Sequence, residues 1–541
     1  MHHRVKLIQL MLVLLASLAI VQFSIGITNT APSYEWVDPL RDVRGALVER
    51  HLVVPDEDAM QEAAILGMIE SLDDRYALFI KEDKEKAFIK ELEGDYAGIG
   101  SEVRMIDGEL HIITPMENSP SLAAGIKAGD VVELIDGEPA TNETIEELIQ
   151  RLTGPVGTDV VVFVRHKDGE KEEISITRGH IRSQSVMGLI RRDTKWSWCL
   201  DEDQSIAYVK IRQFNDTTPQ ELVDALKEAE GEDLLKGLVI DLRENPGGAL
   251  SAAIAISDML LERGTIVTVK GRADPERSFN AHPNHVLHGV PILILVNNSS
   301  ASASEIVAGS LQANNRAAIL GTRTYGKGSV QEVLELDSGG MLKFTTARYD
   351  LAGGRTIDKE LSEDTSLWGV DPNEGLVVRE TIQEQRSRFE SREPFIIITD
   401  DEPDPYTCGD LEWLEETLND HQLAQALTAM REKLATGQWP TLTTDEPVIV
   451  GMQAESSSLA KERIEIIKSL IDVDSKLTSL QVKLDEEKAS LIPPDVDLKN
   501  AIVTLTDQEG NEIGTWRVKQ GDIEAALVSL QLELESDTKE Q

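Results

Sequence analysis

The chain has 541 residues, which is too many for one hydrophobic core, so several domains are expected. Hydrophobic residues make up 41% of the chain and aromatic residues 4%, which suits ordinary globular folding. The formal charge of −43 argues against binding to nucleic acid or to anionic lipid through the soluble part, and instead indicates a well-solvated acidic surface.

Residues 1–27 have the pattern of an export signal. His2, His3, Arg4 and Lys6 precede an apolar run over residues 7–27 that is long enough to span a bilayer. The basic flank favours a cytoplasmic N-terminus, and no clear cleavage motif follows. The pattern predicts an uncleaved signal anchor, a transmembrane helix, with a cleaved signal peptide as the alternative. Both place the bulk of the protein outside the cytoplasm.

Residues 35–93 show helical spacing of apolar residues over 38–52 and 56–72, interrupted at residues 73–76. This helical region is expected to be structural, and it is a candidate surface for homo-oligomer assembly.

Residues 94–180 resemble a PDZ domain. Gly98, Ile99 and Gly100 form a glycine-flanked turn whose N–H groups suit a carboxylate, and the segment SPSLAAGIKAGD over 119–130 predicts a short helix entering a turn. Strands are expected over 110–114, 131–135 and 159–165, and a helix over 144–152. PDZ modules bind a peptide as an added strand and capture its C-terminal carboxylate. Arg165, near the end of a strand, is a candidate for coupling this domain to the rest of the chain.

Residues 181–290 alternate strands with helices. Apolar strands are predicted over 206–211 and 237–242, with an amphipathic helix over 218–230 between them. The second strand runs into Asp241-Leu242-Arg243-Glu244-Asn245-Pro246-Gly247-Gly248, and a helix is predicted over 249–261. Asp241 and Arg243 are expected to brace the fold.

Residues 291–331 combine a strand, a serine-rich turn, a helix, a second strand and a glycine-flanked lysine. A serine at the start of a helix is surrounded by backbone N–H groups that can stabilise an oxyanion. No histidine lies between residues 297 and 331, whereas Lys327 between Gly326 and Gly328 can act as a base if burial lowers its pKa.

The C-terminal part combines several short patterns. A strand is predicted over 341–349, an acidic linker over 400–420 and a helix over 422–434. Apolar residues between 466 and 484 follow the 3-4 spacing of a packing helix or short coiled coil, and residues 503–518 have a hairpin pattern. We expect this extension to serve packing or oligomerisation.

The two cysteines, Cys199 and Cys408, would pair only in an oxidising compartment, and the sequence leaves their pairing open. No group of residues has metal-ligand spacing, so neither a metal nor another cofactor is expected.

The serine-rich and lysine segments resemble the carboxy-terminal processing peptidases, also called tail-specific proteases. The resemblance rests on SASASE at 300–305 and GTRTYGKGSVQ at 321–331, and it extends over about residues 40–378. In that family the lysine follows the nucleophile by 25 positions, a spacing that selects Ser302 over Ser300 and Ser304 as the partner of Lys327. The family's lysine-orienting glutamine matches Gln331.

The resemblance implies a fold and a reaction. The fold is an α/β multidomain chain with N-terminal helices (35–93), a β-rich α+β PDZ domain (94–180), an α/β peptidase core with a mixed sheet (181–378), and a helical C-terminal extension with a small β-hairpin (379–541). The reaction is that of a serine endopeptidase with a Ser302–Lys327 dyad and an oxyanion hole at Gly248, with Gly247 as second choice, and Ala303. Its substrates would be exported proteins with free apolar C-terminal tails, and its place the periplasmic side of the cytoplasmic membrane.

Some positions depart from the family pattern. Arg75 and Ala352 stand where the family often has proline, and Ala313 stands where an aspartate often follows the helix glutamine. The last difference removes a supporting carboxylate but leaves the Ser-Lys pair intact.

Two other functions fit parts of the sequence. A catalytically silent PDZ adaptor that binds protein C-termini would be expected to lack the serine or the lysine, yet both are present. A Ser-His-Asp hydrolase would need His180, His282, His285 or His288 near the serine, and the sequence has no G-x-S-x-G elbow.

Overall fold

The computed structural model describes residues 34–443, apart from 94, 183, 193, 204, 231–233, 274, 284–286, 360–367 and 400–406. It also describes residues 445, 456, 460, 463, 464, 466–481, 502–506 and 512–517. The chain divides into two compact units, Met1–Ala454 and Glu455–Gln541. The predicted anchor over residues 7–27 lies outside the described residues, within which no helix is both long enough and apolar enough to cross a bilayer.

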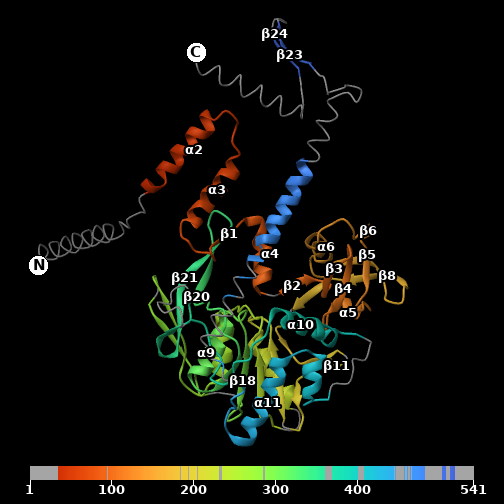
Figure 1. Ribbon diagram of the computed structural model, residues 1–541, viewed down its shortest axis with the longest axis vertical. Helices are drawn as coiled ribbons and strands as arrows, with labels where there is room; N and C mark the ends of the chain where they lie inside the picture. The colour runs from red at the N-terminus through yellow and green to blue at the C-terminus, as the bar shows by residue number, and fades with distance from the viewer. Residues whose placement is uncertain are drawn as a thin grey trace, which may run out of the picture. The chain divides into compact units, whose positions relative to one another are not determined.

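A six-stranded mixed sheet forms the centre of the first unit (Figure 1). Its parallel part has the order β14, β15, β18, β19, and β10 and β13 pair antiparallel with β14. The strand bounds are β10 Val186–Met187, β13 Cys199–Asp201, β14 Ile206–Ile211, β15 Gly237–Asp241, β18 Ile292–Val296 and β19 Ala317–Gly321. Because parallel strands are joined by helical crossovers, they are covered on both faces, which explains their continuous apolar runs.

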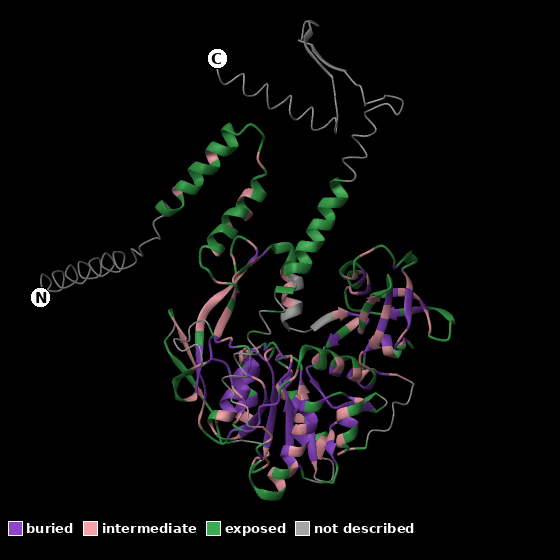
Figure 2. Cartoon of the chain, viewed as in Figure 1, coloured by how far each residue is buried: buried purple, intermediate pink, exposed green. Residues whose placement is uncertain are grey.

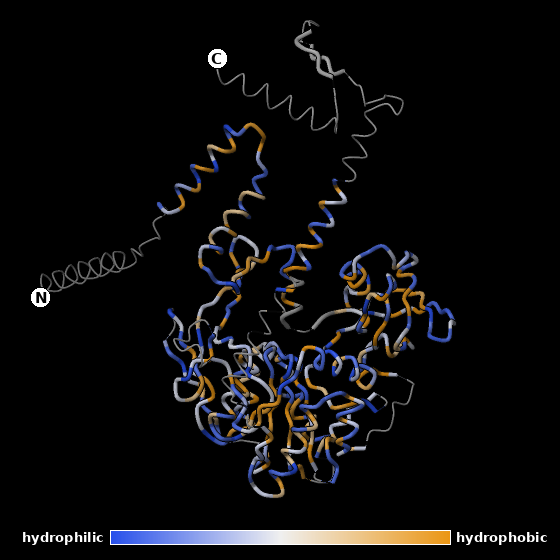
Figure 3. The backbone as a smooth tube through the Cα atoms, viewed as in Figure 1, coloured by the Kyte–Doolittle hydropathy of each residue, from blue (hydrophilic) through white to orange (hydrophobic). Residues whose placement is uncertain are grey.

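Helices cover both faces of this sheet. Successive residues of one strand point to opposite faces, so Ile240 packs with α7–α9 while its neighbour Val239 packs with α11. The strands accordingly appear buried and strongly hydrophobic along their lengths (Figures 2 and 3). The helices are α7 Thr218–Glu230, α8 Leu250–Leu260 and α9 Ala303–Ala313 on one face, and α10 Ile382–Ile396, η3 Trp413–Thr417 and α11 His421–Thr436 on the other.

The second face depends on residues beyond 378, where the sequence predicted the core to end. Leu423, Leu427 and Met430 of α11 are fully buried against this face of the sheet, and Phe395 and Trp413 pack edge to face with ring centroids 5.1 Å apart. The hydrophobic core therefore continues through α11 into the predicted extension.

A buried charge cluster joins α11 to the end of β15. Arg243 contacts Asp241 and Asp420 at 2.8 Å each, and all three side chains are buried. Burial alone would raise the pKa of Asp241, but Arg243 holds it well below its ordinary value. As expected from the sequence, Asp241 and Arg243 brace the fold.

A second, antiparallel sheet packs beside the central one. Its order is β1, β21, β16, β17, and β20 and β22 also pair with β21. The bounds are β1 Leu78–Ile80, β16 Thr265–Gly271, β17 Arg277–Asn280, β20 Ser329–Glu335, β21 Met341–Leu351 and β22 Arg355–Thr356, with η2 at Ala352–Gly354. Strand β1 brings the N-terminal region onto this sheet, and β20 begins two residues after Lys327.

Residues 101–177 form a separate sheet with its own hydrophobic core. Its order is β3, β4, β5, β7, β8, and β6 pairs with β5. The elements are β3 Ser101–Ile106, β4 Glu109–Pro115, α5 Pro120–Ala123, β5 Val131–Ile135, β6 Glu138–Pro139, α6 Ile145–Leu152, β7 Asp159–Arg165 and β8 Lys171–Thr177. Thr144 and Glu147 form a capping box that starts α6, while Leu148 and Leu152 face the core.

The N-terminal helices are η1 Tyr34–Trp36, α2 Asp38–Arg50, α3 Glu57–Glu70 and α4 Glu82–Glu93. Of these, α2 and α3 lie where the spacing over 38–52 and 56–72 predicted helices. Helices α2 and α3 are mostly exposed (Figure 2), and their exposed residues include apolar ones such as Val43 and Leu66. Two small ribbons complete the unit, β2 Asp95–Gly98 with β9 Gly179–Arg182, and β11 Ile190–Arg192 with β12 Lys195–Ser197.

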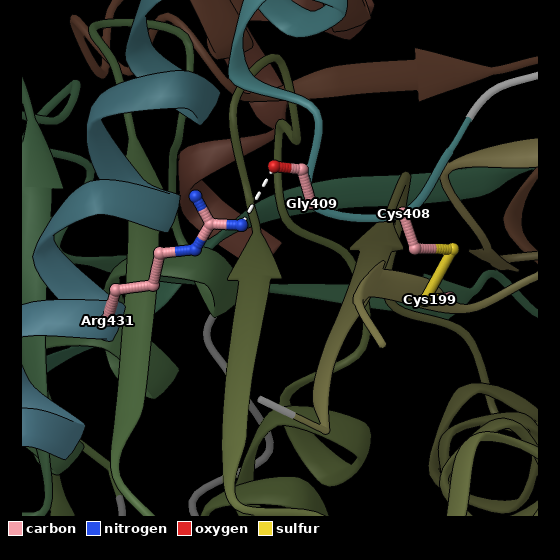
Figure 4. The surroundings of a disulfide bond; sticks show 4 residues. All are labelled: Cys199, Cys408, Gly409 and Arg431. Atoms are coloured by element: carbon pink, nitrogen blue, oxygen red, sulfur yellow. Dashed lines mark hydrogen bonds between the residues drawn. A yellow bond between two sulfur atoms is a disulfide. The ribbon is translucent and has the colours of Figure 1, made fainter. Parts of the chain in front are cut away.

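Cys199 and Cys408 form a disulfide, which settles the pairing that the sequence left open (Figure 4). It joins β13 to the segment before η3, with the two Cα atoms 5.9 Å apart. Next to it, Arg431 of α11 donates to the carbonyl of Gly409 at 2.8 Å and contacts Asp201 at 2.6 Å. The disulfide and Arg431 thus fasten the same segment to the sheet.

In the second unit, residues 466–481 are helical, and β23 Ile502–Thr506 pairs antiparallel with β24 Glu512–Arg517. A helix and a hairpin are the elements predicted here.

Candidate active site

Ser302 sits between β18 and α9, at the N-cap of the helix. Its backbone has φ 55° and ψ −114°, a conformation that favours glycine and strains a residue with a side chain. Such strain persists only where surrounding contacts enforce it, and here the turn after β18 is held by Asn297 and Ser300.

The neighbouring serines are engaged in structural hydrogen bonds. Ser300 donates its hydroxyl to the carbonyl of Leu242 at 2.8 Å, and Ser304 donates to the carbonyl of Asn245 at 3.0 Å. Both are fully buried, whereas Ser302 is half-buried. Of the three serines at 300, 302 and 304, Ser302 is thus the one that a substrate could reach.

Glu305 lies one turn into α9 and is fully buried. Its Oε2 accepts from the backbone N–H of Ser302 at 2.8 Å and of Lys327 at 2.9 Å. Its Oε1 accepts from the N–H of Gly326 at 2.7 Å and from the hydroxyl of Thr324. One carboxyl group therefore holds the serine turn and the lysine loop together, and burial raises its pKa to about 7.

Lys327 has a partly buried ammonium group. Burial lowers the pKa of this lysine, and the nearby positive charge of Lys343 lowers it further. Nζ lies 4.4 Å from the centre of the Tyr76 ring. Tyr349 donates its hydroxyl to the carbonyl of Lys327 and also interacts with the Ser302 side chain. The described hydrogen bonds include none between Oγ of Ser302 and Nζ of Lys327.

A glycine loop, residues 247 and 248, lies against the serine turn. A Cβ placed on Gly247 would lie 2.7 Å from Cβ of Ser302 and 3.0 Å from N of Ala303, so the glycine loop touches the serine. The N–H of Gly247 is used by Asn245 Oδ1 at 2.9 Å. The N–H groups of Gly248 and Ala303 have no acceptor among the described hydrogen bonds, so both remain available to a ligand.

Gln331 lies on β20, close to the lysine loop but turned to other partners. Its amide nitrogen donates to Ser329 Oγ at 2.9 Å and to Thr345 Oγ1 at 3.5 Å. Thr345 in turn donates to Asp74. The described contacts of Gln331 do not include Lys327.

Several residues of this site were not singled out from the sequence. Tyr76, together with Asp74, comes from the N-terminal region, and Glu305 and Tyr349 come from α9 and β21. Only Glu305 had a local signal, the S-x-x-E spacing of a capping box from Ser302.

The other candidate residues lie elsewhere. Arg165 pairs with Glu133 at 3.0 Å and Glu109 at 2.8 Å, both on its own sheet. Gly98, Ile99 and Gly100 lead into β3, and the carbonyls of the last two accept hydrogen bonds from residues 116 and 121. The N–H groups of Ile99 and Gly100 have no acceptor among the described hydrogen bonds.

The histidines that a Ser-His-Asp hydrolase would use have partners of their own. His282 pairs with Asp258 and His288 with Glu262, and both imidazoles are 75% exposed. His180 lies on β9, and His285 falls outside the described residues.

Comparison with known proteins identifies the family. The sequence model described as Peptidase family S41 matches residues 205–374. A carboxy-terminal-processing protease of Bartonella bacilliformis is 32% identical over 380 residues, covering 69% of this chain and 82% of that protein. The carboxy-terminal processing protease CtpA of Bacillus subtilis is 31% identical over 306 residues, covering 56% and 63%.

Among solved structures, a photosystem II D1 C-terminal processing protease is 25% identical, with a TM-score of 0.36, and the match covers 62% of this chain and 86% of that one. The family assignment rests on the sequence relatives. The chain belongs to peptidase family S41 and is a serine-type carboxy-terminal processing peptidase.

Proposed function

We propose that this peptidase cleaves its substrates with a Ser302–Lys327 dyad and selects them by their C-terminal tails. The observation that carries this proposal is the shared acceptor, Oε2 of Glu305, which binds the backbone N–H groups of both residues. The same carboxyl group thereby brings the accessible serine and a lysine of lowered pKa to one point.

In the proposed reaction, neutral Lys327 accepts the proton of the Ser302 hydroxyl as Oγ attacks the peptide carbonyl. Collapse of the tetrahedral intermediate breaks the C–N bond, and Lys327 returns the proton to the leaving amine. Water then attacks the acyl-enzyme and regenerates Ser302. A lowered lysine pKa supports this role, because only the neutral amine can accept a proton.

The negative charge on the carbonyl oxygen needs donors that are already in place. The N–H groups of Gly248 and Ala303 fit this role, because Ala303 follows Ser302, Gly248 follows the glycine that touches Ser302, and neither N–H is used by the described hydrogen bonds. Gly247, the second choice, fits less well, since Asn245 accepts from its N–H. Gln331 would orient Lys327 after a side-chain rotation away from Ser329.

We propose that the sheet over residues 101–177 acts as a PDZ domain that binds the substrate tail. Strand β3 is the edge strand of this sheet, so an extended peptide can pair with its open side. The free N–H groups of Ile99 and Gly100, just before β3, would receive the terminal carboxylate. The apolar core beneath the strand suits apolar tails.

An exported location is proposed as well, on the periplasmic side of the membrane with residues 7–27 as anchor. The described disulfide supports it, because such bonds persist mainly in oxidising compartments.

The test compares wild type, Ser302→Ala and Lys327→Ala without residues 1–27, on an unfolded protein whose C-terminus is free or capped by a charged tag. Both substitutions should lower the cleavage rate about 1,000-fold or more, and the tag should slow cleavage by wild type. Cleavage that survives Lys327→Ala would overturn the dyad. Tail binding without any cleavage by wild type would favour the silent adaptor instead.

A further inference from the structure

A cavity of about 350 Å³ lies between the β3–β4 hairpin and the peptidase core, separate from the catalytic serine. The hairpin contributes residues such as Glu102, Arg104 and Ile113, and α10 contributes Phe389 and Arg392. Contacts across the boundary hold the two sides together, among them Arg104 with Glu393 at 2.6 Å.

The cavity is distinct from the proposed tail groove. Along β3, Glu102 and Arg104 line the cavity, while the alternate residues Val103 and Met105 pack into the core of their own sheet. The cavity therefore lies on the outer face of the hairpin. Residues 98–100, the proposed carboxylate loop, are not part of its lining.

The lining is cationic although the chain is strongly acidic. It includes seven Arg or Lys side chains and four Glu side chains, an excess of three positive charges, in a chain of net charge −43. No described residue pairs with the guanidinium groups of Arg182 and Arg212. Arg392 is only 7% exposed, and its Nε has no hydrogen-bond partner among the described residues. An unpaired buried donor in a cavity is costly unless a ligand accepts from it.

The remaining lining is apolar. Met187, Trp196, Ile396 and Ile397 contribute, and Phe389 has 65% of its surface exposed. The volume is near the lower end of ordinary ligand pockets, so it suits a small group rather than a folded partner. The four carboxylates in the lining disfavour a polyanion such as a nucleotide.

We propose that this cavity is a second peptide site, which binds the last few apolar residues of a short peptide through its free carboxylate and thereby changes the peptidase rate. The class of ligand rests on the proposed function, because a tail-cleaving peptidase produces such peptides. The cationic and apolar lining does not depend on it.

The route to the active site runs through Glu244, which lines the cavity. Its Oε1 accepts from Arg388 at 2.7 Å and from Asn297 at 2.7 Å. Asn297 opens the turn that carries Ser302. The residue after Glu244, Asn245, accepts from the N–H of Ala301 through its carbonyl at 3.0 Å. A carboxylate that competes with Glu244 for Arg388 would loosen the contact to this turn.

The binding test uses the Ser302→Ala chain, so that cleavage cannot intervene. Calorimetry would compare acetyl-Ala-Leu-Val with a free carboxylate, its C-terminal amide, and octanoate. The acid should bind, and the amide at least tenfold more weakly. The double variant Arg182→Gln/Arg212→Gln should bind the peptide with a free carboxylate at least tenfold more weakly. The control Arg272→Gln, which replaces an exposed arginine outside the cavity, should not change this affinity.

Equal binding of acid and amide, or unchanged binding by the double variant, would overturn the proposal. Binding of octanoate but not the peptide would also overturn it, in favour of an aliphatic acid as ligand.

With Ser302 intact, the peptide should change the cleavage rate at least twofold in wild type and Arg272→Gln but not in the double variant. An unchanged rate in wild type would refute the coupling. If the proposed Ser302–Lys327 mechanism is wrong, a separate result would show it, namely cleavage that persists in Lys327→Ala.

Discussion

The backbone N–H groups of Ser302 and Lys327 donate to the same atom, Oε2 of Glu305, at 2.8 and 2.9 Å. Two loops on either side of α9 and β19 are thereby tied to one buried carboxyl group. The position of the lysine relative to the serine depends on this group, which is also the buried acid whose pKa is raised to about 7.

Glu305→Gln should remove a pH dependence of stability. The folded pKa of Glu305 is raised, so the folded state favours the protonated acid, and stability from this group is lost as pH rises from about 4.5 through about 7. The full effect is about 3 kcal/mol. Urea unfolding of wild type and Glu305→Gln between pH 5 and 8 should show wild type losing stability relative to the variant.

The matched control is Glu332→Gln, at an exposed position of β20, whose unfolding should match that of wild type between pH 5 and 8. A constant difference between wild type and Glu305→Gln across this range would contradict the assignment of the raised pKa.

Lys327→Arg should abolish cleavage at every pH, because a guanidinium group is not deprotonated in this range. For wild type, the base is the neutral amine, so kcat/KM should rise with pH, with its midpoint below the ordinary lysine value of 10.5. Lys343→Gln removes a positive charge that lowers this pKa, so its profile should shift to higher pH. An unshifted profile would show that Lys343 does not act on the base.

Asp420→Asn should destabilise the protein by about 3 kcal/mol. The substitution keeps the size of the side chain but leaves Arg243, which is fully buried, with one carboxylate in place of two. Urea unfolding measures the change. As a control, Glu390→Gln breaks the exposed pair with Arg386 and should leave stability unchanged. Equal effects of the two substitutions would mean that the buried cluster contributes no more than a surface pair.

Replacing both cysteines, Cys199→Ser/Cys408→Ser, should lower the free energy of unfolding by about 3–5 kcal/mol, because the disulfide closes a long loop, with a sequence separation of 209 residues. Reductant should destabilise wild type by a similar amount and leave the double variant unchanged. A wild type that is insensitive to full reduction would rule out this contribution.

Local patterns predicted much of this fold. The strand over 131–135 and the helix that starts after Thr144 match their predicted residues, because a short apolar run between turn residues and a capping box are encoded within a few positions. The extent of the core was less visible, since α11 reaches the sheet after a long connection and its apolar face looks the same whether it packs on the core or on a partner.

Part of the candidate active site was likewise predictable from the sequence, and part was not. The serine turn and the lysine loop were recognisable from their residues and spacing, and the structure brings their backbones together. Tyr76 was not recognisable from the sequence, because its place beside Lys327 depends on the pairing of β1 with β21. That pairing joins distant segments and leaves no local pattern. Whether Gln331 orients Lys327 stays a prediction.

The conformation of Ser302 has a consequence for the evolution of the protein. At φ 55° and ψ −114° a glycine would fit without strain, so Ser302→Gly should fold more stably than wild type by about 1 kcal/mol while losing the nucleophile. The residue at the reacting centre is therefore one that selection for stability alone would discard. A member of this family that is no longer under selection for catalysis would therefore be expected to carry glycine at this position.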